Sequence, residues 1–242
     1  MRRRKSVHHF IYATPHHLAA TFAVLSLPVI ALGLLAYVEN IALGPFLIGV
    51  ALSSVRLFIA YLIAVVVGWV LAVSFATGKR SAVALPVFDV LQSFPTFAAL
   101  PLAIALWGVS NLTVILFLVI TVIWPIFFSI VSSRKLIRRD WQDAATMSGL
   151  KGFKYLRYFI IPATLPGLIT GSIIGLGEGW EALVATEIIV GIKSGLGPFF
   201  SLNNQNVTIT IFGISALLVI IFTINKLLWL PLLQWGHGLT EE

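Results

Sequence analysis

The sequence contains no cysteine among its 242 residues. This absence excludes disulfides, zinc–thiolate sites and a cysteine nucleophile. It also means that cysteine usage does not indicate whether the protein works in an oxidising or a reducing compartment. Charged residues are also scarce, at 10% of the chain, whereas soluble globular domains contain about 25%. The nucleotide-binding pattern Gly-x4-Gly-Lys-Ser/Thr is absent, because the one Gly-Lys pair, Gly78-Lys79, lacks both the upstream glycine and a following hydroxyl residue. We therefore expect no ATP hydrolysis by this chain.

Hydrophobic residues dominate what is present, at 59% of the chain, with a mean hydropathy of +1.00. Because about 20 apolar residues span the hydrocarbon of a bilayer, we predict an all-α integral membrane protein with six transmembrane helices in a single domain over residues 1–242. Apolar residues lie on all sides of these segments without period-two alternation, which favours a helical bundle over an outer-membrane barrel. The predicted spans are 18–38, 51–76, 83–107, 111–131, 163–190 and 207–233.

Lysine and arginine accumulate in cytoplasmic loops, and their distribution predicts a cytoplasmic N-terminus. In that orientation residues 1–17 form a basic cytoplasmic segment, and the first span is too long for a signal-peptide core, so we expect it to be retained. Only Arg56 and Lys193 then lie near the outer face, while Lys226 snorkels from the last span. The net charge of +7 follows from topology and anionic lipid headgroups, so no nucleic-acid partner is expected. The cytoplasmic cations are Arg2, Arg3, Arg4, Lys5, Lys79, Arg80, Arg134, Lys135, Arg138, Arg139, Lys151, Lys154 and Arg157.

The predicted cytoplasmic loop, residues 132–162, contains an amphipathic pattern. Apolar or small residues recur at helical spacing, and charged residues occupy the other side. Gly149 and Gly152 interrupt the pattern, and Pro162 begins the next span, so we predict a helix, a glycine bend and a second helix. An interfacial helix that only binds headgroups is the alternative. The recurring residues are Ile137, Trp141, Ala144, Ala145 and Ser148, opposite Arg138, Arg139, Asp140, Gln142 and Asp143.

The same loop carries a longer spacing pattern, from Asp143 to Pro162. It resembles the signature Glu-Ala-Ala-x3-Gly-x9-Ile-x-Leu-Pro of inner-membrane permease subunits from binding-protein-dependent ABC importers. Asp143, Phe159 and Ile161 depart from it but keep the charge or the apolar character. Over about residues 50–200 the sequence looks closest to the nitrate, sulfonate and taurine subfamily. Fragments in the order of that subfamily include Ser93-Phe94-Pro95, Trp107-Gly108-Val109, Trp124-Pro125, Ala185-Thr186-Glu187 and Gly195-Leu196-Gly197.

The resemblance implies a permease of the type I importer fold, with five core helices behind an N-terminal span, in a bacterial or archaeal plasma membrane. It also implies a second permease subunit, an external solute-binding protein and two cytoplasmic ATPase subunits, which would hold the ATP and magnesium. This chain would need no cofactor. The short helix of the loop would insert into the ATPase, so the predicted coupling residues are Arg138, Arg139, Trp141, Asp143, Ala144, Ala145, Gly149 and Pro162.

Small residues form a stripe along the predicted span 163–190. Gly167, Gly171, Gly175 and Gly179 recur every fourth position, which allows close approach of another helix. Contact within the bundle and contact with a second permease copy both fit this stripe.

The same span contains acidic residues at membrane depth. A charge near the bilayer centre costs about 2.5 to 3.5 kcal/mol, so Glu178 and Glu181 must face a wet path or a partner. With Trp180 and the kink expected at Pro95, they are predicted to line the translocation path or its gate. Hydrogen bonding to Ser, Thr, Asn or Arg56 of other helices is the alternative, and Glu187 is expected to be structural at the outer end.

Two other readings remain open at this point. A stand-alone secondary transporter would couple proton or sodium flow through Asp89, Glu178, Glu181 and Glu187. Four histidines, His8, His9, His16 and His17, lie near the N-terminus, but without a carboxylate or thiol partner they do not predict a metal site. The identity of the cargo is not readable, although acidic residues in the path suit an anion poorly.

Overall fold

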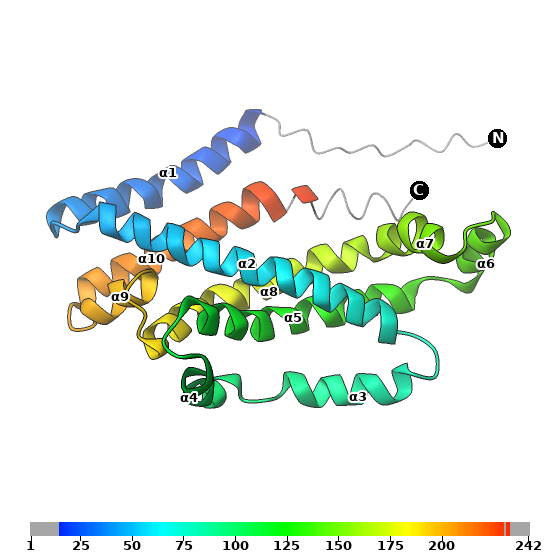
Figure 1. Cartoon of the computed structure of the whole chain (residues 1–242). Helices are drawn as coiled ribbons and strands as arrows, with labels where there is room; N and C mark the ends of the chain where they lie inside the picture. The colour runs from blue at the N-terminus through cyan, green and yellow to red at the C-terminus, as the bar shows by residue number, and fades with distance from the viewer. Residues whose placement is uncertain (1–14, 230, 233–242) are drawn as a thin grey trace.

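The computed structural model describes residues 15–229, 231 and 232, and of residues 15–25 it describes the backbone alone. Within this part of the chain every regular element is a helix (Figure 1), so the all-α prediction is confirmed. Most of the basic N-terminal segment, with His8 and His9, lies outside the described residues, as do the side chains of His16 and His17. The elements are α1 Pro15–Val38, α2 Leu43–Phe75, α3 Ser81–Gln92, α4 Thr96–Trp107, α5 Asn111–Leu136, α6 Arg139–Met147, α7 Gly152–Tyr155, a π-helical turn Leu156–Ile160, α8 Ile161–Val190, α9 Leu196–Leu202, α10 Val207–Ile224 and a second π-helical turn Asn225–Trp229.

The long helices lie side by side and give the molecule two distinct ends. The connection from α2 to α3 lies at the same end as α6 and α7, while α9 and the turn from α1 to α2 lie at the opposite end (Figure 1). Helix α5 forms the centre, because Leu118, Val122, Ile126 and Ile130 are fully buried at four-residue intervals. A row with this spacing lies along one face of a helix and packs into the grooves of its neighbours.

The number of membrane spans is where the structure departs from expectation, and the predicted count of six is not confirmed. Among the residues that the structure describes, four helical segments are long and apolar enough to cross a membrane, namely Leu43–Phe75, Asn111–Leu136, Gly152–Val190 and Val207–Trp229. Helices α3 and α4 would form a fifth span together, but they are bent by 82°. The described apolar part of α1, Ser26–Val38, is shorter than a full span.

The bend between α3 and α4 has a local cause. Pro95 is the residue immediately before α4, and proline has no N–H to continue the hydrogen bonds of a preceding helix. It also disfavours helical geometry at the residue before it. The predicted kink at Pro95 is therefore confirmed as a complete break, whereas Pro101 lies inside α4.

Helix α2 begins earlier than the sequence predicts. It starts at Leu43 instead of residue 51, because Pro45 falls in its first turn, where proline is tolerated. Arg56 therefore lies about 20 Å along the helix axis from the start, at 1.5 Å per residue. Arg56 is only 5% exposed, so it lies inside the bundle, and its partners Asn111 and Ser194 lie at the end where α5 begins and α8 has ended.

The glycine stripe of α8 lies against helices of the same chain. A Cβ atom added at Gly171 would stand 2.6 Å from Ile126 Cα, and one at Gly175 would stand 3.0 Å from the Val122 carbonyl oxygen. Gly167 meets Ser133 and Ser129 of α5 in the same way, and Gly179 meets Leu57 of α2. The stripe thus allows α8 to approach the backbone of α5, and it is not left open for a second copy.

Candidate coupling surface and translocation cavity

The loop between α5 and α8 forms the end of the molecule farthest from α9 (Figure 1). Its main helix, α6, buries only Ala145 among its own residues. Ile137, immediately before α6, is 7% exposed. Ala144, by contrast, is exposed. The predicted apolar side of α6 therefore only partly faces the bundle, and the remainder of the helix is available to another molecule.

A glycine bend ends α6 at the predicted position. The Leu150 N–H donates to the Ala145 carbonyl at 3.1 Å and the Gly149 N–H donates to the Thr146 carbonyl at 3.0 Å. This pair of bonds defines a Schellman motif, which requires a left-handed residue. Gly149 has a φ of +81°, a conformation that glycine adopts without steric cost. Apart from its two chain neighbours, no described residue lies within 4 Å of a Cβ atom built at Gly149, so the space around the bend is open.

Large apolar side chains are exposed around this bend. Met147 is 88% exposed and Phe153 is 72% exposed, and Trp141 on α6 is 47% exposed. Isolated exposed apolar residues are ordinary, but a group gathered on one polar loop indicates a contact surface. The basic residues beside them, Lys151 and Lys154, are also exposed. Together these side chains form what we call the loop surface: Trp141, Met147, Lys151, Phe153 and Lys154.

The charged residues predicted for coupling have different surroundings. Arg138 is already engaged, because its Nη2 lies 2.7 Å from Asp140 Oδ2 and its guanidinium lies 6.0 Å from the Trp141 ring centroid. Arg139 and Asp143 are exposed and form no ion pair with the described part of the chain. Asp143 is therefore the acidic side chain of the signature that is free to meet a partner.

The loop joins α8 through a widened turn. The Ile161 N–H donates to the Leu156 carbonyl five residues earlier, and Pro162 follows in the first turn of α8. Because a proline ring clashes with the carbonyl four residues before it, the π-helical turn Leu156–Ile160 accommodates Pro162 without ending the helix. The chain thus runs from the loop into α8 as one helical segment, Gly152–Val190.

A polar cavity lies beside the break between α3 and α4. Its volume is about 640 Å³, and its walls come from α3, α4, α5 and α8. Ser93 and Thr96, on either side of Pro95, line it together with Glu178, so the structure brings two of the predicted path elements to one place. The other lining residues are Gln92, Ile120, Thr121, Trp124, Pro125, Phe128, Ser129 and Ile174.

Glu178 and Glu181 are exposed on the surface of α8. Neither forms a hydrogen bond or ion pair with the residues that the structure describes, so the alternative of interhelical bonding, including bonding to Arg56, is not what is found. Since lipid contact by two carboxylates at this depth is costly, this face of α8 requires water or a second subunit.

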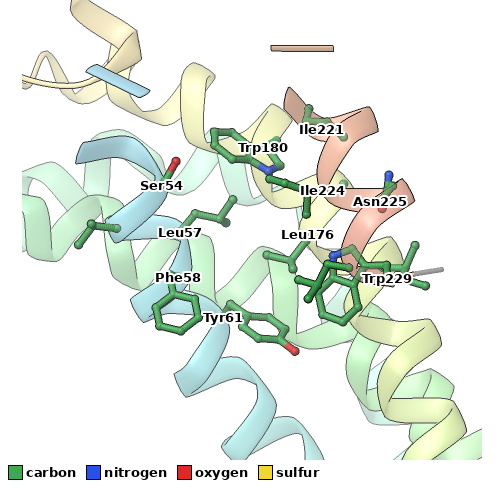
Figure 2. Close-up of a pocket in the computed structure, with 14 residues that line it drawn as sticks. Ser54, Leu57, Phe58, Tyr61, Leu176, Trp180, Ile221, Ile224, Asn225 and Trp229 are labelled. Atoms are coloured by element: carbon green, nitrogen blue, oxygen red, sulfur yellow. The ribbon is translucent and has the colours of Figure 1, made fainter. Parts of the chain in front are cut away.

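Trp180 does not line the cavity that Glu178 lines, although the sequence predicts that the two lie on one path. Two residues after Glu178, it points to another side of α8 and is 8% exposed. It lines a separate, apolar cavity of about 450 Å³ between α2, α8 and α10. Figure 2 shows Trp180 directed toward Ile221 and Ile224, with Tyr61 and Trp229 at the other side of the cavity.

A buried polar cluster lies where α2, α8 and the segment before α9 meet. Arg56 Nη1 donates to Glu187 Oε1 at 2.6 Å, and Ser53 Oγ donates to the same carboxylate. The Gly197 N–H donates to Glu187 Oε2 at 2.8 Å. Glu187 is fully buried, so its predicted structural role agrees with its surroundings.

Arg56 extends the cluster to two further elements. Its Nε donates to Asn111 Oδ1 in the first turn of α5, and its Nη2 donates to Ser194 Oγ in the segment before α9, both at 2.8 Å. Sequence reasoning missed this pairing. An arginine and a glutamate, each isolated in an apolar span, were the available signal, because buried charges in a membrane pair with one another.

A family model described as "Binding-protein-dependent transport system inner membrane component" matches residues 64–228. The chain is 32% identical over 151 residues to the nitrate import permease protein NrtB of Leptolyngbya laminosa, covering 62% of this chain and 54% of that protein. It is 31% identical over 150 residues to the taurine transport system permease protein TauC of Escherichia coli, covering 61% and 54%.

A third relative is named for bicarbonate. The permease protein CmpB of Synechococcus elongatus is 27% identical over 148 residues, covering 61% of this chain and 53% of that protein. The chain spans about half the length of the curated relatives it matches. These matches confirm that the chain resembles the permease subunits to which the loop signature pointed.

Proposed function

This chain belongs to the family of inner membrane components of binding-protein-dependent transport systems, and from that premise we propose that it is the permease subunit of an ATP-driven importer. In this proposal α3, α4, α5 and α8 form the solute path, and the loop between α5 and α8 receives the motion of a separate ATPase. The proposed cargo is a small solute that an external binding protein delivers. The relatives are named as permeases for nitrate, bicarbonate and taurine, which supports a transport role without fixing this cargo.

The loop surface is the observation that carries the proposal. It combines an open glycine bend with exposed apolar side chains, and α8 leads directly from it into the membrane. An amphipathic helix that docks into a groove places its apolar residues inside that groove. A partner ATPase that holds α6, α7 and the bend at Gly149 would therefore displace the end of α8 when nucleotide changes the shape of the groove.

The proposed orientation places the loop surface in the cytoplasm. Lysines and arginines of the connection from α2 to α3 lie at the same end as those of the loop (Figure 1), and clusters of this kind mark the cytoplasmic side. Lys193, before α9, lies at the other end and would face the binding protein. The cations at the loop end are Lys79, Arg80, Arg134, Lys135, Arg138, Arg139, Lys151, Lys154 and Arg157.

The test of coupling is the substitution Gly149→Trp in the importer assembled with its ATPase. Apart from Gly149 and its two chain neighbours, nothing described lies within 4 Å of the Cβ position there, so a bulky side chain extends into the space where a docked partner would lie, and its backbone strain is matched by the control below. We expect loss of ATPase binding, or ATP hydrolysis without uptake, measured by co-purification and by uptake into proteoliposomes.

A matched control exists at Gly78, in the connection from α2 to α3. This glycine also has a positive φ, of +79°, and also has open space at its Cβ position, and it lies at the same end of the molecule. Gly78→Trp therefore carries the same backbone strain outside the proposed docking loop. Equal loss of uptake in the two variants, or normal ATPase binding and uptake by Gly149→Trp, would contradict the docking role.

A secondary transporter remains the competing function, and the buried cluster argues against part of it. Glu187 is held by Arg56, Ser53 and the Gly197 N–H, so it is poorly suited to release and bind a proton in each cycle. Uptake by the isolated chain in liposomes under an ion gradient, without ATPase or ATP, would support the secondary transporter and reject the importer.

A further inference from the structure

The polar cavity beside the break between α3 and α4 is lined, in the described part of the chain, by one charged side chain, the carboxylate of Glu178. We propose that it is a selectivity site that admits a cationic or uncharged polar solute and rejects anions, with Glu178 as the residue that sets the sign. This inference rests on the proposed function, because it takes the cavity to be part of the solute path. It assigns this chain a cargo of a different charge class from the nitrate and bicarbonate for which two of its relatives are named.

The depth of Glu178 makes its charge effective. Helix α8 has 30 residues, and Glu178 lies about 4 Å from the midpoint of its axis at 1.5 Å per residue. Glu181, also exposed, follows one turn later toward the α9 end. Charges at such depth act through a medium less polarisable than bulk water, so they influence a nearby ion more strongly than surface charges do.

The groups around Glu178 favour hydrogen bonding without balancing its charge. Among the described residues that line the cavity, none is basic, and Ser93, Thr96, Thr121 and Ser129 offer hydroxyl groups. Thr121 already donates its own hydroxyl proton to the Phe117 carbonyl, which leaves its oxygen as an acceptor. The Glu178 carboxylate and the hydroxyl oxygens therefore bind cations and hydrogen-bond donors of a solute, whereas an anion is repelled by the carboxylate and finds no basic side chain among the described lining residues.

The match extends to uncharged solutes through acceptors in the wall. The Glu178 carboxylate and the Thr121 oxygen both accept hydrogen bonds from donors on a polar solute. Trp124 also lines the cavity, but its indole Nε1 is buried, has no hydrogen-bond partner in the part of the chain described, and is not reached from the cavity. The polar match therefore depends on Glu178 and the hydroxyl groups.

The cations elsewhere in the chain do not reverse this balance. Arg56, the arginine buried among the apolar helices, is neutralised by Glu187 at 2.6 Å and is absent from the cavity lining. The other lysines and arginines of the described helices lie toward the helix ends or in the connections.

The absence of native cysteine allows a direct test inside the assembled importer. Thr121→Cys places one thiol in the cavity wall, and its rate of modification is measured with a cationic and an anionic methanethiosulfonate reagent of similar size. The ratio of the two rates is divided by the ratio for free mercaptoethanol, which removes the intrinsic difference between the reagents. Thr96→Cys, in the opposite wall, serves as the second probe in case the first variant fails to assemble.

The expected result is a normalised preference for the cationic reagent of about fivefold or more. Opposite unit charges about 8 Å from a carboxylate differ in rate by that factor in a water-like medium, and by more at lower dielectric. Adding Glu178→Gln should abolish most of the preference, and adding Glu181→Gln should reduce it less. At Ser132→Cys, outside the cavity lining, Glu178→Gln should leave the ratio unchanged.

The outcomes separate this inference from the proposed function. Equal normalised rates for both reagents, with access that depends on nucleotide, would overturn charge selection while leaving the path in place. A preference that survives Glu178→Gln would also overturn it. No reaction of either probe in any nucleotide state would instead show that the cavity is not part of a path, and both proposals about it would fail.

Discussion

The buried ion pair between Arg56 and Glu187 allows the sharpest prediction about stability. The substitution Glu187→Gln keeps the size of the side chain but removes its charge. In the native cluster the two carboxylate oxygens accept from Ser53, Arg56 and the Gly197 N–H. An amide has one acceptor oxygen, and its NH2 group would face at least one of these donors. The variant therefore loses the charge partner of Arg56 and also sets two donors against each other.

The size of the effect follows from burial. The side chains of Arg56 and Glu187 have relative exposures of 7% and 0%, so Arg56 would be left with an uncompensated charge. Removing one partner of a buried pair costs about 3–5 kcal/mol. A domain of this size loses roughly 2–4 °C in Tm per kcal/mol, which gives an expected decrease of about 6–20 °C. The surface pair between Arg138 and Asp140, with exposures of 68% and 56%, provides the control, because exposed pairs contribute at most about 1 kcal/mol.

The assay is thermal unfolding of the purified chain in detergent, followed by the fluorescence of its seven tryptophans. Glu187→Gln is compared with Asp140→Asn under the same conditions. A second comparison uses the double variant Arg56→Met/Glu187→Met, which should be less destabilised than the sum of the two single variants, because neither charge is then left alone. Additive single effects, or a decrease in Tm for Glu187→Gln no larger than that for Asp140→Asn, would refute the reasoning.

Three further predictions concern the glycines and the loop surface. Gly171→Ala should lower the Tm, because the added Cβ contacts the α5 backbone and should reduce the free energy of unfolding by about 1–3 kcal/mol. Gly177→Ala, whose Cβ has no described neighbour within 4 Å, should leave the Tm unchanged or raise it. Equal changes in Tm for the two variants would reject the packing contact. Gly149→Asn should retain coupled uptake and Gly149→Val should lose it, because asparagine tolerates a left-handed backbone and a β-branched residue does not. Normal uptake by the valine variant would show that the left-handed bend at Gly149 is not needed for coupling. Phe153→Ser should weaken ATPase binding, measured by co-purification, about tenfold or more without changing the Tm, and unchanged binding would remove Phe153 from the docking surface.

Much of the fold is readable from the sequence where its cause is local. Apolar runs indicate helices, and the bend at Gly149 follows from a glycine between two amphipathic segments. The break at Pro95 follows from the missing N–H and the restricted residue before it. Each of these features depends on residues within a few positions of one another, so a spacing pattern is enough to find it.

The parts that the sequence did not reveal depend on contacts between distant residues. Arg56 and Glu187 are 131 positions apart, and no local pattern states that they meet. The orientation of Trp180 depends on how α8 is rotated against α2 and α10, which was not derivable from its nearness to Glu178. The start of α2 differs from the predicted one for another reason, because Pro45 falls in the first turn of the helix, where a proline does not end it.

Helix α8 connects these findings, because it extends without interruption from the loop surface to the Arg56–Glu187 cluster. Its glycines hold it against the α5 backbone over several turns, so α5 and α8 form a stiff pair whose side chains interlock. Helix α3, in contrast, has no buried residue and is separated from α4 by the break at Pro95. In the proposed importer, a displacement that enters α8 at Pro162 would therefore be transmitted along the stiff pair, and the cavity would change most easily on its α3 side. Glu178 lies on the stiff side of that cavity, so the proposed selecting charge would stay in a fixed position while the opposite wall moved.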